Sequence, residues 1–188
     1  MARKPNAGCR SRAHVAEEAI VEEQQEVLAR TVGAVMRSAV VTVEVGETVL
    51  VAWELLQRSG SRHLPVVRTD GRCAGLLERA DVAVACGAPA VALSGLRVDE
   101  LLRGHGPVLV HVEQPVRHAV DLMTYTEVDA LPVLAEDGRL AGVLTAADIL
   151  AALAGRPVRE EPTDWRPQAP TVLPGLPPRR GYRGTAFP

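Results

Sequence analysis

The chain has 188 residues, of which 47% are hydrophobic, enough to bury the core of one medium or two small domains. Its formal net charge is −2 and aromatic residues make up only 3% of it, so it offers neither a strong electrostatic field nor base-stacking platforms. The composition therefore argues against nucleic-acid binding and against attraction to an anionic membrane.

The cysteines and the N-terminal sequence indicate a reducing compartment. Cys9, Cys73 and Cys86 are odd in number and lack C-x-x-C spacing, which argues against a disulfide framework. The basic start of the chain is followed by acidic EEAIVEEQQE instead of an apolar stretch, unlike a secretion signal. The longest uncharged apolar stretch is interrupted by proline and glycine and is too short to span a bilayer. We expect a cytoplasmic protein.

The first predicted element is an acidic helix within residues 1–30. Residues 13–29 place Ile20, Val27 and Leu28 on or near one face, with glutamates elsewhere. We expect this helix to lead into the folded part of the chain.

An internal duplication follows. HLPVVRTDGRCAGLLERADV (63–82) and ALPVLAEDGRLAGVLTAADI (130–149) superimpose without a gap, with Pro65 and Pro132 as equivalent residues 67 positions apart. The match extends upstream through a further strand and helix. It predicts two repeats, at residues 31–88 and 96–154.

Periodicity predicts the elements of each repeat. Val41, Val43 and Val45 alternate as in a strand, and Val49 and Ala52 recur at helical spacing. HLPVV is a second strand, and the Asp-Gly pair that follows predicts a hairpin turn into a third strand and a closing helix. The order β-α-β-β-α defines an α/β (α+β) fold, in which two pseudo-symmetric units cover each other by packing through their sheets.

The C-terminal segment, residues 155–188, has a different composition. It contains eight of the fourteen prolines, interspersed with arginines, and this predicts a disordered tail. LPGLPPRR has the extended polyproline character that suits docking grooves, while an inert end is the alternative.

With its L-P-V strand, D-G turn and G-h-h-T-x-x-D ending, residues 31–154 resemble the cystathionine-β-synthase (CBS) domain family, whose domains occur as tandem pairs called Bateman modules. The resemblance implies a module without catalytic activity or required cofactor. Such modules often form homodimers and bind AMP, ADP, ATP or S-adenosylmethionine between the repeats. A regulated protein partner is implied but not identified.

The resemblance assigns ligand contacts to Thr145 and Asp148 in GVLTAAD, to ribose or phosphate and to the ribose diol respectively. A carboxylate can accept hydrogen bonds from two adjacent hydroxyls, and a helix N-terminus favours a nearby phosphate. The same spacing also fits the [ST]-x-x-[DE] capping box, which requires no ligand. Both interpretations remain open at this point.

Three further residues belong to the expected ligand set. Ala130 and Pro132 belong to the L-P-V strand of the second copy, and Asp81 is the equivalent of Asp148 in the first. The first copy has Glu78 in place of Thr145, and this second anion would repel phosphate. We expect the Asp81 site to be weak or empty.

Arg62 and His63 come immediately before the LPVV segment of the first copy. The resemblance implies that the residues at this position in each repeat approach the cleft. The pair could supply positive charge to a ligand held by Thr145 and Asp148, or it could be a solvated arginine and a partly buried histidine. If Arg62 faces the cleft, AMP, ADP or ATP fits better than S-adenosylmethionine; if it faces solvent, the preference could reverse.

No catalytic or metal site is expected. His105, His111 and His118 recur at a spacing that does not place two of them on one face of a helix or strand. The chain lacks a Walker loop, a Rossmann fingerprint and a nucleophile set. The alternative to a ligand sensor is a ligand-free dimerisation or protein-interaction module.

Overall fold

Each repeat folds as a strand, a helix, two strands and a second helix, as the sequence predicts. A computed structural model describes residues 12–87, 95–102 and 107–157. The first repeat contains β1 (Val43–Glu44), α2 (Val49–Ser59), β2 (His63–Val67), β3 (Cys73–Glu78) and α3 (Arg79–Cys86). The second contains β4 (Val110–His111), α6 (Val116–Thr126), β5 (Ala130–Leu134), β6 (Leu140–Thr145) and α7 (Ala146–Leu153).

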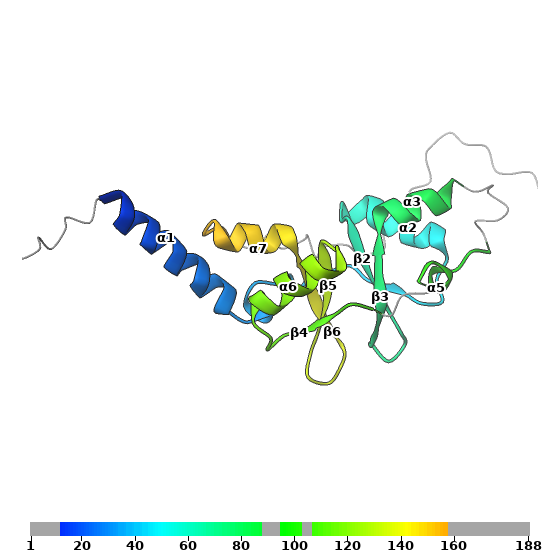
Figure 1. Ribbon diagram of the computed structural model, residues 1–188. Helices are drawn as coiled ribbons and strands as arrows, with labels where there is room; N and C mark the ends of the chain where they lie inside the picture. The colour runs from blue at the N-terminus through cyan, green and yellow to red at the C-terminus, as the bar shows by residue number, and fades with distance from the viewer. Residues whose placement is uncertain (1–11, 88–94, 103–106, 158–188) are drawn as a thin grey trace, which may run out of the picture.

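The two sheets have identical topology and register. Their strand orders are β1-β2-β3 and β4-β5-β6, the first pair in each being parallel and the second antiparallel. Val66 lies opposite Gly75 in the first sheet, and the equivalent Val133 lies opposite Gly142 in the second. The α+β fold with two pseudo-symmetric repeats is thus confirmed, and the sheets meet where β3 contacts β5 (Figure 1).

The predicted Asp-Gly turns join the hairpin strands. Gly71 and Gly138 have φ values of 80° and 79°, a left-handed conformation that glycine adopts without strain. The two hairpin tips lie side by side (Figure 1), and the amide of Leu140 donates to the carbonyl of Gly71 at 3.2 Å. The turns therefore contribute to the contact between the repeats.

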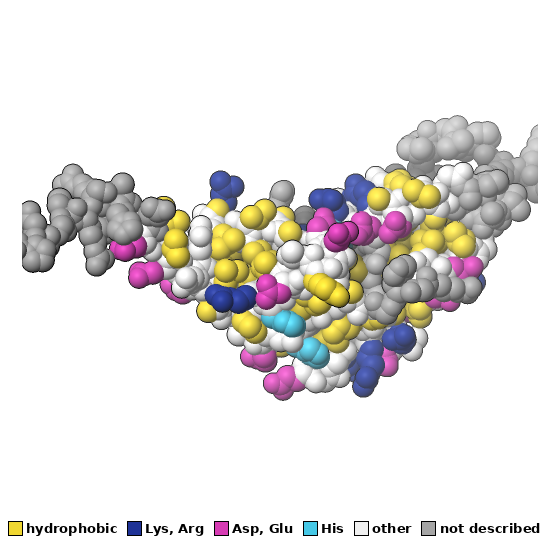
Figure 2. Space-filling model, viewed as in Figure 1, with side chains coloured by type: hydrophobic (Ala, Val, Ile, Leu, Met, Phe, Trp, Pro, Cys, Tyr) yellow, Lys and Arg dark blue, Asp and Glu magenta, His cyan; other side chains and the backbone are white. Residues whose placement is uncertain are grey.

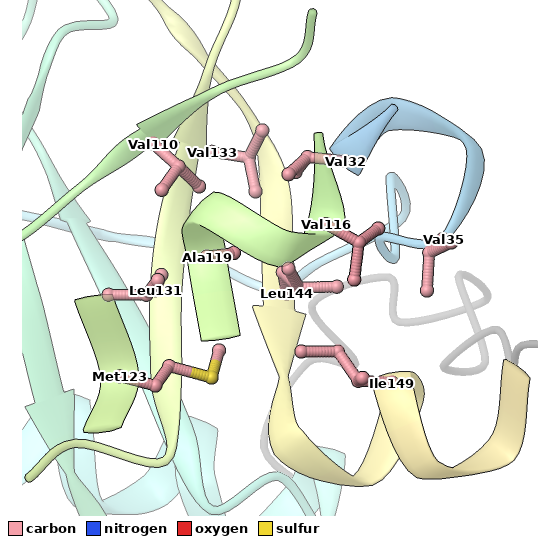
Figure 3. Close-up of a cluster of buried hydrophobic side chains, with 10 residues drawn as sticks. All are labelled: Val32, Val35, Val110, Val116, Ala119, Met123, Leu131, Val133, Leu144 and Ile149. Atoms are coloured by element: carbon pink, nitrogen blue, oxygen red, sulfur yellow. The ribbon is translucent and has the colours of Figure 1, made fainter. Parts of the chain in front are cut away.

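The long helices bury equivalent apolar residues. Val49, Ala52 and Leu56 of α2 are buried in the first core. Their equivalents in α6, Val116, Ala119 and Met123, are buried in the second (Figure 3). The residues that recur at helical spacing in the sequence are therefore the ones that these helices bury.

Each core is completed by a segment that precedes the other repeat. We call residues 31–37 and 95–102 the lead-in segments. Val32, in the 3₁₀ helix η1 (Val32–Ala34), and Val35 lie in the core of the second repeat (Figure 3). Val98, in α5 (Val98–Leu101), lies in the core of the first. The amide of Gly33 donates to the carbonyl of Val112 at 2.9 Å, and that of Val98 to Glu47 at 2.9 Å. The repeats thus exchange lead-in segments.

The predicted acidic helix is α1 (Arg12–Ala29), which extends from the second repeat (Figure 1). Its C-terminal end is anchored, since Val27 is buried and α1 contacts α6 and α7. Ile20 and Val21 remain 55% and 45% exposed, so the apolar face is only partly covered by this chain. The predicted tail beyond residue 157 lies outside the described residues.

The lead-in segment of the first repeat crosses β6 at Gly142. The amide of Arg37 donates to the carbonyl of Val143 at 2.9 Å, and the amide of Val143 donates back at 3.0 Å. A Cβ at Gly142 would collide with the Arg37 carbonyl group, whereas one at the equivalent Gly75 would meet the Leu102 side chain, 2.8 Å away. The hydrogen-bonded backbone at Arg37 cannot move aside without breaking the crossing, whereas the end of the Leu102 side chain can rotate away.

We therefore expect Gly142→Ala to lower the free energy of unfolding by about 3 kcal/mol, because the crossing must open. Gly75→Ala, its matched control, should cost about 1 kcal/mol or less, since Leu102 can change rotamer. Denaturant unfolding of both variants measures the difference. Equal losses would contradict the crossing at Gly142.

Candidate functional site

Two clefts lie between the repeats. The Thr145 cleft has a volume of about 320 Å³, within the range of roughly 300–1,000 Å³ typical of small-molecule sites. The Asp81 cleft has a volume of about 580 Å³. Each takes the beginning of a central strand from one repeat and a strand–helix junction from the other, so the clefts are related by the duplication.

The structure divides the predicted ligand residues between the clefts. Arg62, His63 and Thr145 line the Thr145 cleft. Asp81, Ala130 and Pro132 line the Asp81 cleft, together with Glu78. Asp148 is absent from the lining of both. Ala130 and Pro132 thus lie with Asp81, for which a separate site was expected, and not with Thr145.

Thr145 and Asp148 form a capping box at the start of α7. The Thr145 hydroxyl accepts from the Asp148 amide at 3.2 Å, and Asp148 Oδ2 accepts from the Thr145 amide at 2.9 Å and from its hydroxyl at 2.6 Å. Asp148 is only 4% exposed. The capping interaction that the sequence pattern allows is therefore present, and it occupies both side chains.

Arg37 is the residue of this site that the sequence analysis missed. Its Nε lies 3.0 and 3.1 Å from the two carboxylate oxygens of Asp148, and its Nη2 donates to the Thr145 hydroxyl at 3.1 Å. Arg37 also lines the cleft. It comes from the lead-in segment of the first repeat, and its 67-residue equivalent is Gly104, so the comparison of the copies gave no signal.

The opposite wall carries Arg62, His63 and Asp129. His63 Nε2 lies 2.8 Å from Asp129 Oδ1, and Arg62 Nη2 lies 3.3 Å from Asp129 Oδ2. The His63 side chain is 9% exposed, whereas that of Arg62 is 78% exposed. Arg62 therefore combines a position at the cleft with access to solvent, so it can reorient toward a ligand.

The two clefts differ in charge. The described lining of the Thr145 cleft includes two arginines, one histidine and one aspartate. That of the Asp81 cleft includes Glu78 and Asp81 and, among the residues the structure describes, no arginine or lysine. Glu78 makes no side-chain cap at α3, in contrast to Thr145 at α7. The Thr145 cleft is thus better suited to an anion.

The face in Figure 2 shows acidic and basic side chains in small, scattered groups, without a continuous basic field.

One group of described side chains has donor atoms close enough to share a cation: His63, Glu78 and Asp129. Burial raises the pKa of the Cys73 thiol, which keeps this cysteine in the less reactive protonated form. None of the described helices combines the length and apolar character needed to cross a bilayer.

The fold and the clefts define a tandem-repeat module with ligand-sized sites between its halves. The family model for the CBS domain matches residues 32–87 and 100–155. The chain therefore belongs to the CBS-domain family.

Known relatives include a CBS domain-containing protein of Dictyostelium discoideum, 32% identical over 123 residues, which are 61% of this chain and 85% of the relative. A homoserine O-acetyltransferase of Methanohalobium evestigatum is 25% identical over 115 residues, which are only 22% of that enzyme. The match to the enzyme is thus partial. CBS-domain pairs are generally regulatory and not catalytic.

Solved CBS structures have the same fold. CBSX2 in complex with AMP is 26% identical, with a TM-score of 0.58 over 67% of this chain and 97% of that one. The CBS domain of a bacterial CNNM/CorC family Mg²⁺ transporter with ATP has a TM-score of 0.65 at 20% identity, over 76% and 99%. The CBS domain pair of protein MJ0100 in complex with 5'-methylthioadenosine and S-adenosyl-L-methionine has a TM-score of 0.58 at 21% sequence identity. The match covers 68% of this chain and 98% of that one.

The Arg37–Asp148 pair generates a stability prediction. Asp148→Asn removes the counter-charge of a largely buried guanidinium and weakens the cap, so we expect a loss of about 3 kcal/mol in unfolding free energy. The matched control, Asp81→Asn, changes an exposed carboxylate at the equivalent position and should cost less than about 1 kcal/mol. Denaturant unfolding without ligand measures both. A small effect at Asp148 would contradict the structural role of the pair.

Proposed function

We propose that this chain is a non-catalytic regulatory module that binds an adenosyl ligand in the Thr145 cleft. The observation that carries the proposal is the arrangement of Arg37, Arg62 and His63 around the first turn of α7, in a cleft that both repeats line. The AMP, ATP and S-adenosyl-L-methionine complexes of CBS proteins with this fold support an adenosyl ligand.

A phosphate-bearing ligand, such as AMP, ADP or ATP, suits this cleft better than S-adenosylmethionine. Thr145, Ala146 and Ala147 bring the N-terminal turn of α7 to the cleft wall, where backbone amides and the helix dipole favour an anion. Arg62 lines the same cleft and can form charge-assisted hydrogen bonds with phosphate. A sulfonium cation would gain nothing from either feature.

Arg37 provides a way for the ligand to act on the fold. A phosphate near its guanidinium would compete with Asp148 and release that carboxylate toward the ribose diol. Because Arg37 belongs to the lead-in segment that follows α1, this change would alter a contact between the repeats. The ligand would then favour the conformation in which these contacts are rearranged, and so change the affinity for a partner protein.

The ligand test is a thermal-shift series with AMP, ADP, ATP, S-adenosylmethionine and NADH at millimolar concentration. We expect the nucleotides with phosphate to raise the Tm most. Arg62→Ala should weaken their binding about tenfold or more, the loss of one charged hydrogen bond. Arg58→Ala, an exposed arginine outside the cleft lining, is the matched control and should have no effect.

Absence of a shift with all five compounds would refute the adenosyl-ligand proposal. An equal effect of Arg62→Ala and Arg58→Ala would instead remove Arg62 from the site. We expect the Asp81 cleft to bind nucleotides weakly or not at all, so Asp81→Ala should leave the ligand-induced shift unchanged, whereas Asp148→Ala should abolish it.

A ligand-free dimerisation or protein-interaction module is the second candidate. It is supported by large apolar side chains exposed on the helices, Tyr125 at 89%, Val84 at 80% and Leu150 at 66%. Covering such residues in a homodimer would remove apolar surface from water. In this function, as in the first, we propose a cytoplasmic protein with a protein partner.

The dimer has its own test. We expect the wild-type chain to elute as a dimer in size-exclusion chromatography with light scattering, and Tyr125→Ser combined with Leu150→Ser to shift it toward monomer, because the substitutions remove apolar contact area. Ile20→Ser, a similarly exposed position on α1, is the control and should leave the dimer intact. A monomeric wild type, or a double variant that remains dimeric, would contradict a dimer through these helices.

A further inference from the structure

Near the contact between the repeats, His63, Glu78 and Asp129 direct three potential ligand atoms toward one another. One atom from each side chain, an imidazole nitrogen or a carboxylate oxygen, lies within 4.8 Å of the other two. We propose that these side chains bind a divalent transition-metal ion of the zinc class.

The backbone places these ligands together from both repeats. His63 begins β2 and lies directly opposite Glu78, the last residue of β3, in the strand register. Asp129 immediately precedes β5 of the second repeat. A metal ion here would therefore be coordinated by a cross-strand pair of the first repeat and by one residue of the second repeat, and it would link the two repeats.

The two carboxylates of the group favour the binding of a cation between them. Glu78 and Asp129 bring carboxylate oxygens within 4.8 Å of each other, where like charges repel. His63 Nε2 already lies 2.8 Å from Asp129 Oδ1, and the His63 side chain is only 9% exposed. A neutral imidazole and two carboxylates would together compensate the charge of a divalent ion.

The donor types select the kind of metal. Mg²⁺ and Ca²⁺ prefer ligand sets made entirely of oxygen, whereas imidazole nitrogen suits zinc and its neighbours. Tetrahedral zinc requires donor atoms about 3.4 Å apart, given bonds of about 2.0–2.2 Å. Donor atoms near the 4.8 Å limit must therefore approach by about 1 Å, whereas His63 Nε2 and Asp129 Oδ1, at 2.8 Å, must move slightly apart. Glu78 is exposed and the Asp129 side chain is 43% exposed, so both carboxylates have room to move.

Neighbouring arginines leave the ligand atoms accessible. Arg62 pairs with Oδ2 of Asp129, the oxygen that does not face His63. The guanidinium of Arg79 is held by the carbonyl oxygens of Ser61 and Leu56, at 2.6–3.0 Å. Duplication does not reproduce the group: the equivalents of His63, Glu78 and Asp129 are, in order, Ala130, Thr145 and Arg62.

The duplication also supplies the test variant. Glu78→Thr introduces the residue that the second repeat carries at this position, where it caps α7 and pairs with an aspartate three residues later. Since Asp81 stands in the same place in the first repeat, we expect this variant to fold. It removes one proposed ligand and leaves the lining of the Thr145 cleft unchanged.

Zinc is added to the 188-residue chain after treatment with EDTA, without nucleotide, and its affinity is measured by competition with a chromophoric chelator. We expect wild-type protein to bind zinc and to gain Tm, and Glu78→Thr and Asp129→Asn each to lose about tenfold or more in affinity. The control Glu54→Gln, an exposed carboxylate on α2, should bind as wild type does.

Failure of the wild type to bind zinc overturns the proposal, as does wild-type affinity in both Glu78→Thr and Asp129→Asn, which would place zinc at other side chains. His63 and Asp129 also line the Thr145 cleft, so the two sites are distinguished by residues that they do not share. Arg62→Ala should weaken nucleotide binding while zinc affinity is maintained, and Glu78→Thr should weaken zinc binding while nucleotide binding is maintained. Zinc binding and nucleotide binding can therefore fail independently.

Discussion

The exchange of lead-in segments between the repeats is the constraint on which the other features depend. Val32 and Val35 fill the core of the second repeat, and Val98 fills that of the first, so neither core is complete without chain from outside its own repeat. The exchanged backbone also fixes the relative position of the two sheets. Both inter-repeat clefts, and the position of Arg37 beside α7, follow from that arrangement.

The sequence predicted the fold well because duplication repeats each local signal. The helical spacing of Val49 and Ala52 and the two Asp-Gly turns occur in the expected elements, whereas of the alternating valines only Val43 lies in the short strand β1. The exchange itself was not predictable. The hydrophobic pattern predicts that Val32 and Val98 are buried, but it does not show in which of the two similar cores each of them lies.

The candidate site was less predictable than the fold. Thr145 and Asp148 fit both a cap and a ligand cradle, and only the reciprocal hydrogen bonds between the two residues in the structure reveal the cap. Ala130 and Pro132 were expected to contact the ligand, but the sequence did not show which cleft they line, and they lie in the Asp81 cleft. His63, Glu78 and Asp129 belong to no local motif, since their proximity arises only from strand pairing and from the contact between the repeats.

The exchanged segments also bear on how a pair of such repeats can be maintained. Two separate polypeptides that exchanged these segments would assemble only above a certain concentration, and their folding would follow mass action. Within one chain the exchange is intramolecular, and the short distance between the repeats sets a high effective concentration for each partner segment. Covalent fusion thus makes the interface between the repeats independent of expression level.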